Sequence, residues 1–116
     1  MKKLIPLVAV LALLVGCATM TTTAGRLLST TALTVDGAMQ GWAMWVAEGQ
    51  ASVEQGVQVK TAYVKYQASM KVAKSAYATL VLNGDKSAWE QAALVLQANE
   101  AALLTLTKSF MTGGAL

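Results

Sequence analysis

The sequence contains no histidine, one cysteine and one proline. Because histidine is the commonest general base and metal ligand, its absence argues against most acid–base and metal chemistry. A single cysteine cannot form a disulfide within the chain, so stability has to come from packing. The proline, Pro6, lies near the N-terminus, and abundant Ala, Val, Leu, Gln and Met follow it. After residue 26 this composition is typical of a helical protein with a buried seam.

The remaining polar residues form no catalytic pattern. The carboxylates are dispersed, and no two have the i, i+3 or i, i+4 spacing that places a pair on one helix face; they are Asp36, Glu48, Glu54, Asp85, Glu90 and Glu100. Lys71 and Ser75 are four residues apart, but a Ser/Lys nucleophile pair needs a buried oxyanion site that nothing here indicates. The scattered glycines form no phosphate-binding loop. We therefore predict a non-enzyme with no catalytic residue, no metal and no bound cofactor.

A cationic start, Met1-Lys2-Lys3, leads into an apolar run over residues 4–15 that ends at Leu14-Val15-Gly16-Cys17. A membrane-spanning helix needs about 20 apolar residues, so this run is too short to span comfortably. The segment resembles the signal peptide and lipobox of a bacterial lipoprotein precursor. The resemblance covers only the first 17 residues. The alternatives are a plain secretory signal, whose small-x-small cleavage pattern Leu14 fits poorly, and an uncleaved anchor.

The resemblance implies that residues 1–16 are removed and that Cys17 becomes the lipidated first residue, carrying a covalent fatty acid such as palmitate. It places the protein on a membrane outside the cytoplasm. With Ala18 after the cysteine, and not aspartate, it implies sorting to the periplasmic face of the outer membrane in a Gram-negative host. The murein-linked lipoprotein is also small and helical but ends in lysine, whereas this chain ends in Gly113-Gly114-Ala115-Leu116. Attachment to the cell wall is therefore not supported.

The basic character of the chain depends on its first residues. The formal net charge is +3, from nine basic and six acidic residues. Removal of Lys2 and Lys3 with the signal leaves seven basic against the same six acidic residues, a net charge of +1. A nucleic-acid partner needs a concentrated basic face, so we predict none.

Residues 18–26 have no apolar period, and they are predicted to form a tether behind Cys17 that reaches about 30 Å when extended. The predicted domain order is a signal peptide over 1–16, a lipidated cysteine and tether over 17–26, a helical bundle over 27–112 and a flexible tail over 113–116. With 100 residues left after cleavage, the chain suffices for one modest core.

Three segments, about 27–49, 52–82 and 86–111, carry apolar and small residues at alternating spacings of three and four. Such stripes are typical of coiled-coil-like helix seams. The stripes are Leu28, Ala32, Val35, Met39, Trp42 and Val46; Val59, Tyr63, Tyr66, Met70, Ala73, Tyr77 and Leu80; and Trp89, Ala92, Leu96, Asn99, Leu103, Leu106 and Phe110. They predict an all-α, antiparallel three-helix bundle. The alternative is a hairpin of the second and third helices, with the first loosely attached or engaged with another subunit.

Local signals mark the helix ends. Gly49 suits the left-handed position after the first helix. Ser52-Val-Glu-Gln55 resembles a capping box at the start of the second. Asn83-Gly84-Asp85 supplies the next turn, with either Asp85 or Ser87 as cap and Glu90 completing a box from Ser87.

Two features inside the stripes have more than one interpretation. Gly37 and Gly41 each cost about 1 kcal/mol relative to alanine. Close approach of a neighbouring helix within the chain would offset this cost, and we favour it over self-association. Asn99 either fixes the register and partner number from a buried position or lies at the edge of a wide stripe.

Surface contacts are the remaining functional candidates. In an up, down and up bundle, four basic residues gather at the membrane-proximal end, where each would contribute about 1 kcal/mol on anionic head groups; they are Arg26, Lys71, Lys74 and Lys86. Alternatively, these residues simply solvate the bundle. Trp42 is predicted to point inward and Trp45 partly outward, as a partner contact, unless it packs in the core.

Three functions fit these features. The first is a small lipid-anchored, non-enzymatic helical envelope protein with a structural or protein-interaction role, as a homo-oligomer or with another envelope protein. The second is a phage- or plasmid-type exclusion or lysis-associated lipoprotein acting on a receptor or on the membrane. The third is a periplasmic module that holds an apolar ligand between its helices. Neighbouring genes would separate the first two.

Overall fold

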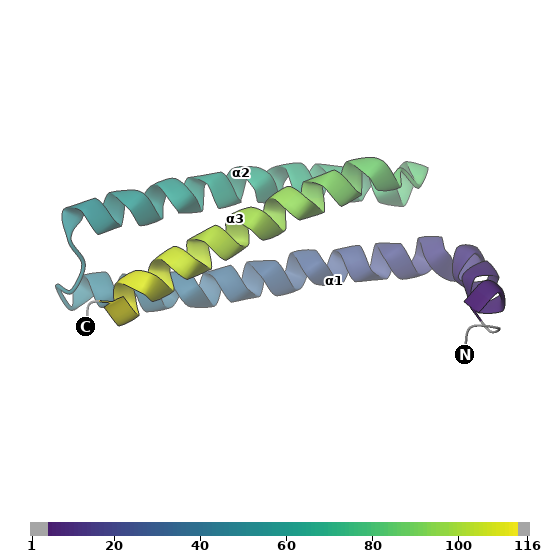
Figure 1. Cartoon of the computed structure of the whole chain (residues 1–116). Coiled ribbons are helices and arrows are strands. Elements are labelled where there is room, and N and C mark those ends of the chain that lie inside the picture. Colours follow the sequence, from purple (N-terminus) through teal and green to yellow (C-terminus); the bar gives the residue numbers. More distant parts are fainter. Residues whose placement is uncertain (1–4, 114–116) are drawn as a thin grey trace.

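The structure, a computed structural model, describes residues 5–113, with side chains described from Met20 onward. It contains α1 (Ile5–Ala47), α2 (Val53–Asn83) and α3 (Lys86–Gly113), and no strand within this range. The three helices lie side by side and alternate in direction (Figure 1). The predicted all-α, antiparallel three-helix bundle is therefore confirmed.

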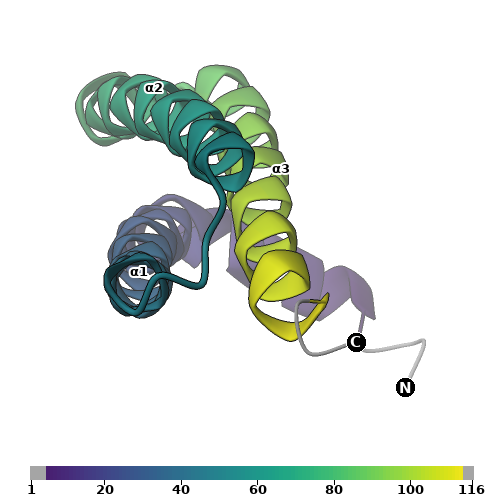
Figure 2. The ribbon, with the colours of Figure 1, turned by 90° about the vertical axis from the view of Figure 1, so that its left-hand side faces the viewer.

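The helices do not contribute equally to the bundle. α2 and α3 form a closely packed hairpin, whereas α1 makes fewer contacts with each of them. In the end-on view of Figure 2, α1 lies below α2 and contacts the open side of the hairpin. The structure thus combines the two predicted arrangements, because α1 contacts both partners but is the least tightly held helix.

The core is built from the predicted stripes. Leu96 and Leu103 on α3 are fully buried between the helices, and Val35 and Val59 meet them from α1 and α2. The other buried apolar side chains are Ala24, Trp42, Tyr66, Met70, Ala73, Ala76, Leu80, Trp89 and Ala92. The aromatic rings pair within this core, with centroids 6.1 Å apart for Trp42 and Phe110 and 6.2 Å apart for Tyr77 and Trp89.

The last turn of α1 departs from its predicted stripe. Val46 is 47% exposed, and Trp45 packs against the core in its place. The spacings from Leu28 to Val46 add up to 18 residues, which is five turns of a helix with 3.6 residues per turn, so Val46 lies in line with Leu28. The buried residues Ala24, Thr31, Val35 and Trp42 lie to one side of this line, and Trp45 lies on the same side.

The helix ends follow the predicted capping. Ser52 and Gln55 exchange two hydrogen bonds of 3.1 Å in a capping box. Gly49 and Gly84 adopt positive φ angles of 75° and 70°. At the start of α3, Asp85 accepts a hydrogen bond from the Ser87 amide at 3.2 Å. Asp85 is therefore the cap, and the Ser87 alternative is wrong because Ser87 lies inside α3.

The predicted tether is wrong where the structure describes it. Residues 20–26 continue α1, Ala24 is 1% exposed, and Met20 and Leu27 pack against the core. Helix propensity is a weak prior that tertiary packing overrides, so a threonine-rich stretch with no apolar period still forms a helix against a neighbour. At the other end, α3 extends to Gly113, and residues 114–116 of the predicted tail lie outside the described residues.

The predicted close approach of a neighbouring helix does not occur at Gly37 and Gly41. A Cβ placed on Gly37 would meet nothing within 4 Å, and one on Gly41 only the Met111 Cε at 3.8 Å. A Cβ on Gly25 would lie 3.1 Å from the Tyr77 hydroxyl oxygen. The glycine that permits tight packing of α1 on α2 is therefore Gly25.

The different surroundings of Gly37 and Gly25 predict that replacement by alanine changes the stability of the chain differently at the two positions. Gly37→Ala should raise the free energy of unfolding by about 1 kcal/mol, because it improves helix propensity without a contact. Gly25→Ala should gain less or lose stability, because its Cβ crowds Tyr77. Thermal unfolding of both purified variants, followed by circular dichroism, measures the difference. Equal stabilisation by the two substitutions would contradict the packing of α1 on Tyr77.

Candidate functional site

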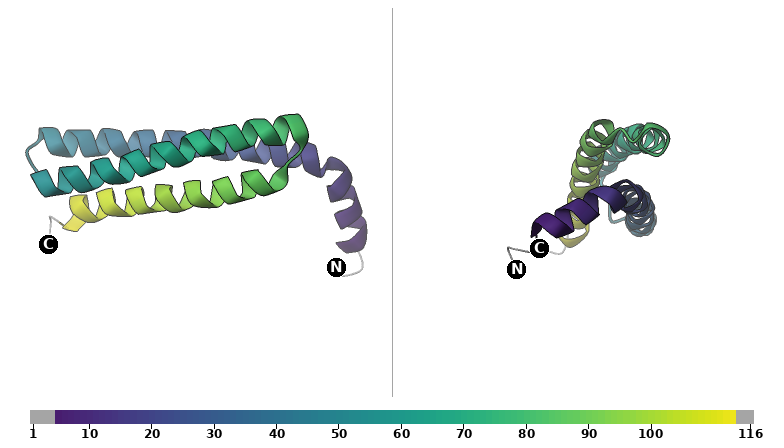
Figure 3. Two further views of the ribbon diagram at one scale, coloured as in Figure 1. Left: turned by 90° about the horizontal axis from the view of Figure 1, so that it is seen from above. Right: turned by 90° about the vertical axis from the view of Figure 1, so that its right-hand side faces the viewer.

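The residues of the predicted lipobox fall within the N-terminal part of α1. Leu14, Val15, Gly16 and Cys17 have helical backbone, and their side chains lie outside the part that the structure describes. In Figures 1 and 3, the N-terminal part of α1 turns away from the bundle at the end where the α2–α3 turn lies. Lipidation of Cys17 stays a prediction.

The contact between Gly25 and Tyr77 fixes the register of α1 against α2. Because the two helices are antiparallel, residue 20 lies near the level of residue 82. Met20, the first described side chain, already packs against the core. The segment from Cys17 to Met20 spans at most about 10 Å. The bundle therefore starts almost directly at the cysteine, and the α2–α3 turn lies beside it.

The four basic residues do not gather at this end. All are exposed, but Lys71 lies 12 residues before the end of α2, about 18 Å along the helix. Lys71 and Lys74 line a shallow surface groove that also contains Asp36 from α1. Only Lys86 lies at the turn itself, with Arg26 on the flank of α1. Contact with lipid head groups therefore stays a prediction chiefly for Lys86 and Arg26.

Trp45 lies at the opposite end of the bundle, and its role as a partner contact stays a prediction. Its ring is half-buried and packs against the core, as the alternative interpretation had it. Its indole Nε1 is buried without a hydrogen-bond partner among the described residues. The exposed apolar side chains nearby are those of Met44 and Val46.

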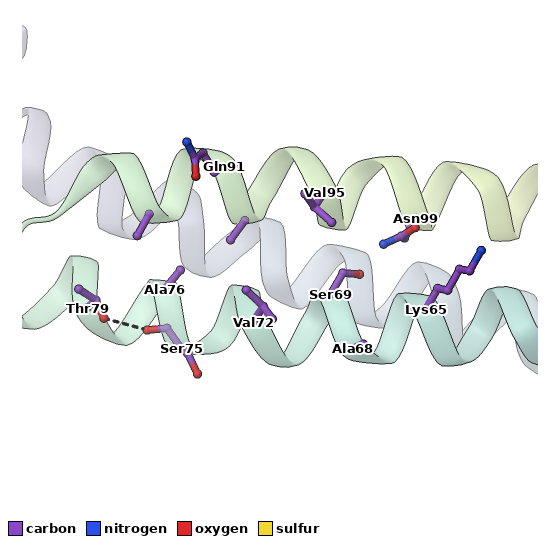
Figure 4. A pocket seen from close by; sticks show the side chains of 12 residues that line it. Lys65, Ala68, Ser69, Val72, Ser75, Ala76, Thr79, Gln91, Val95 and Asn99 are labelled. Carbon is purple, nitrogen blue, oxygen red and sulfur yellow. Dashed lines mark hydrogen bonds between the residues drawn. The ribbon is translucent and has the colours of Figure 1, made fainter.

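The sequence analysis did not predict a groove on the α2–α3 hairpin. This groove has a volume of about 740 Å³ and runs along the outer face of the hairpin, with α1 behind it (Figure 4). A second hollow of about 320 Å³ shares Lys65 and Asn99 with it and extends it toward the start of α2. The larger one is lined by Lys65, Ala68, Ser69, Val72, Ser75, Ala76, Thr79, Ala88, Gln91, Ala92, Val95 and Asn99. We call this joined surface the hairpin groove.

The residues of the hairpin groove recur at helical spacing on α2 and α3, and on α3 two of them, Ala92 and Asn99, also belong to the predicted core stripe. On α2 the stripe is Lys65, Ser69, Val72, Ala76 and Thr79, and on α3 it is Ala88, Ala92, Val95, Asn99 and Ala102. Both stripes have spacings of four, three, four and three, the same as the core seams. Because several of these residues are small, the stripe has little hydrophobicity and does not stand out in the sequence beside the core seams. Asn99 is half-buried at the edge of this groove, as the edge interpretation predicted.

Two titratable groups are perturbed near the middle of the bundle. Burial, with smaller effects of Asp36, Tyr63 and Glu100, raises the pKa of the Tyr66 hydroxyl. Burial also raises the pKa of the Glu100 carboxyl. Among the described side chains, no three His, Cys, Asp or Glu residues cluster as metal ligands would.

The raised pKa of Glu100 predicts a pH-dependent stability. A carboxyl whose pKa is higher in the folded than in the unfolded chain contributes most below the unfolded pKa, and its contribution falls as pH rises through the folded pKa. Glu100→Gln should therefore stabilise the chain at pH 7 relative to its effect at pH 4. Denaturant unfolding at both pH values checks this, with exposed Glu90→Gln on the same helix as the control. An equal effect of Glu100→Gln at both pH values would contradict it.

The protein is an all-α three-helix bundle with an open groove along the closely packed α2–α3 hairpin. Within the described residues, none of the helices has the length and apolarity needed to cross a membrane. Comparisons with protein-family models, with curated proteins and with solved structures each found no match to this chain. The function therefore has to be argued from the residues themselves.

Proposed function

We propose that this protein is a small lipid-anchored, non-enzymatic helical protein of the bacterial envelope, with a structural or protein-interaction role. The lipobox Leu14-Val15-Gly16-Cys17 provides the anchor. On this proposal Cys17 carries the lipid, and the mature chain faces the space outside the cytoplasm.

The observation that carries the proposal is the short distance between the anchor and the core. Met20 packs against the core only three residues after Cys17, and Ala24 is buried one turn later. A lipid on Cys17 therefore holds the bundle directly on the membrane surface, with the turn at Gly84 and Lys86 facing the head groups. Such a body presents its helix flanks sideways, which suits contacts with proteins held in the same membrane.

The processed form of the chain tests this proposal. Mass spectrometry of the protein from the membranes of a bacterial host should find an N-terminal peptide that begins at a fatty-acylated Cys17, with residues 1–16 absent. Separation of the membranes should then place it in the outer membrane of a Gram-negative host, because Ala18 follows the cysteine. A mature N-terminus elsewhere, or a chain that keeps residues 4–15, would refute the anchor.

A further inference from the structure

We propose that the last turn of α2 is a second membrane contact beside the lipid anchor. The exposed side chains of Val81 and Leu82 enter the head-group layer of the bilayer, and the bundle stands upright on this end. This contact rests on the proposed function, because the lipid on Cys17 brings this end of the bundle to the membrane. It adds a named apolar contact and an orientation to that function.

The last turn of α2 exposes two large apolar side chains just before the chain reverses. Leu82 is 80% exposed and Val81 is 52% exposed. α2 ends at Asn83, and Gly84 turns the chain with a φ of 70°. Exposed apolar residues are common on protein surfaces, so exposure by itself identifies no partner. The feature that distinguishes Val81 and Leu82 is their place beside the predicted anchor.

The chain between the anchor and the core is too short to hold Leu82 far from the membrane. Residue 20 lies near the level of residue 82, and the α2–α3 turn and the N-terminal part of α1 lie at the same end of the bundle (Figure 3). Cys17 lies at most about 10 Å from Met20. The head-group layer on each side of the hydrocarbon core is about 5–8 Å thick. A lipid on Cys17 therefore keeps Leu82 within this layer or at its edge.

The opposite end of α2 exposes an apolar side chain to the same degree but lies far from the anchor. Val53 is 85% exposed. It lies 29 residues before Leu82, or about 44 Å along the helix. Glu48 and Glu54 lie at this end with no basic residue between them, so anionic head groups repel it. An anchored bundle therefore rests on the end that carries Leu82.

The charges of the α2–α3 turn are compatible with anionic head groups. Lys86 is exposed, and its ammonium group is attracted to lipid phosphates. The Asp85 carboxylate accepts hydrogen bonds from the amide and the hydroxyl of Ser87, at 3.2 and 3.0 Å, so it is directed at the first turn of α3. The helix dipole stabilises its negative charge there. The turn therefore combines a cation with the apolar Leu82, as residues that lie in a membrane interface do.

Quenching of a fluorescent dye from within the bilayer measures the depth of both ends of α2. Full-length Leu82→Cys and Val53→Cys chains are produced in a bacterial host, purified and placed in vesicles of phosphatidylethanolamine and phosphatidylglycerol. On the proposed function the Cys17 thiol is blocked by its lipid, so a thiol-reactive dye labels only the new cysteine. Dye uptake by the unaltered chain reports any free Cys17 thiol. Val53 is the matched control, because its exposure is similar and it lies at the other end of the same helix.

We expect vesicle lipids that carry a quencher on the acyl chain to reduce the emission of the dye at position 82 at least twofold. The emission of the dye at position 53 should stay unchanged. Both side chains are largely exposed, so neither substitution should change the melting temperature of the bundle, which circular dichroism checks. Equal quenching at both positions would show a bundle that lies on its side, and it would overturn the upright contact.

Fatty-acid labelling of the same chains tests the anchor separately. A chain that carries the fatty acid but shows no quenching at position 82 refutes the contact alone. A chain without fatty acid whose position 82 is still quenched, after subtraction of the signal from Cys17, refutes the lipid anchor alone. A chain with neither fatty acid nor quenching refutes both.

Discussion

Leu96→Ala is expected to lower the free energy of unfolding by about 2–5 kcal/mol, because it leaves a cavity at a fully buried position. Domains of this size are stable by only about 5–15 kcal/mol, so the substitution removes a large part of the total. The loss should lower the melting temperature by roughly 10 °C or more. Thermal and denaturant unfolding of the purified chain, followed by circular dichroism, measure it.

Leu33→Ala is the matched control. It removes the same atoms from an α1 leucine that is 72% exposed and lies away from both the core and the hairpin groove. Its effect should stay within about 0.5 kcal/mol, as for most surface substitutions. Similar losses from Leu96→Ala and Leu33→Ala would contradict the packing of α3 against its neighbours.

The core and the helix ends were predictable from the sequence because both have strong local signals. Large apolar residues at alternating spacings, such as Val59, Tyr66 and Met70, can be buried together only on one face of a helix. The capping box of Ser52 and Gln55 satisfies backbone groups within one turn, so no distant partner has to be known. These features specify three helices and their order without reference to tertiary structure.

The start of the bundle was not predictable in the same way. Residues 20–26 contain threonines with no apolar period, yet Ala24 is buried and Gly25 lies against Tyr77. These residues are buried because their small side chains let α1 approach α2 closely. This close packing exists only once both helices are in place. A hydrophobic pattern reports the free energy of burying apolar surface and not the closeness of two backbones.

The hairpin groove was missed for a related physical reason. Ser69, Ala76 and Ala92 line its base, and each has too little apolar surface to stand out beside the large core residues. Val72 and Val95 do stand out, but in isolation they resemble ordinary exposed valines. Only the structure places them on facing walls at one level of the hairpin. The same reason explains why the three lysines and one arginine that were predicted to contact head groups lie apart, since their positions depend on helix register.

On the proposed function, Cys17→Ser is expected to abolish fatty-acid incorporation completely, because the proposed lipid would be held through the thiol of Cys17, the only cysteine in the chain. The signal over residues 1–16 should then stay attached, since a lipobox needs the cysteine at its last position. Labelled palmitate supplied to growing bacteria and gel analysis of the chain's length measure both effects. Ala18→Ser, which changes the next residue but keeps the thiol and introduces no aspartate, is the control and should keep full labelling.

The variant also separates anchoring from folding. The described core begins at Met20, so Cys17→Ser should leave the melting temperature of the bundle unchanged. A folded but unlabelled chain that no longer stays with the outer membrane is the expected combination. Persistent label on the serine variant would contradict the lipobox, because no other cysteine can carry the lipid. Loss of folding together with label would instead show that residue 17 belongs to the packed part of α1.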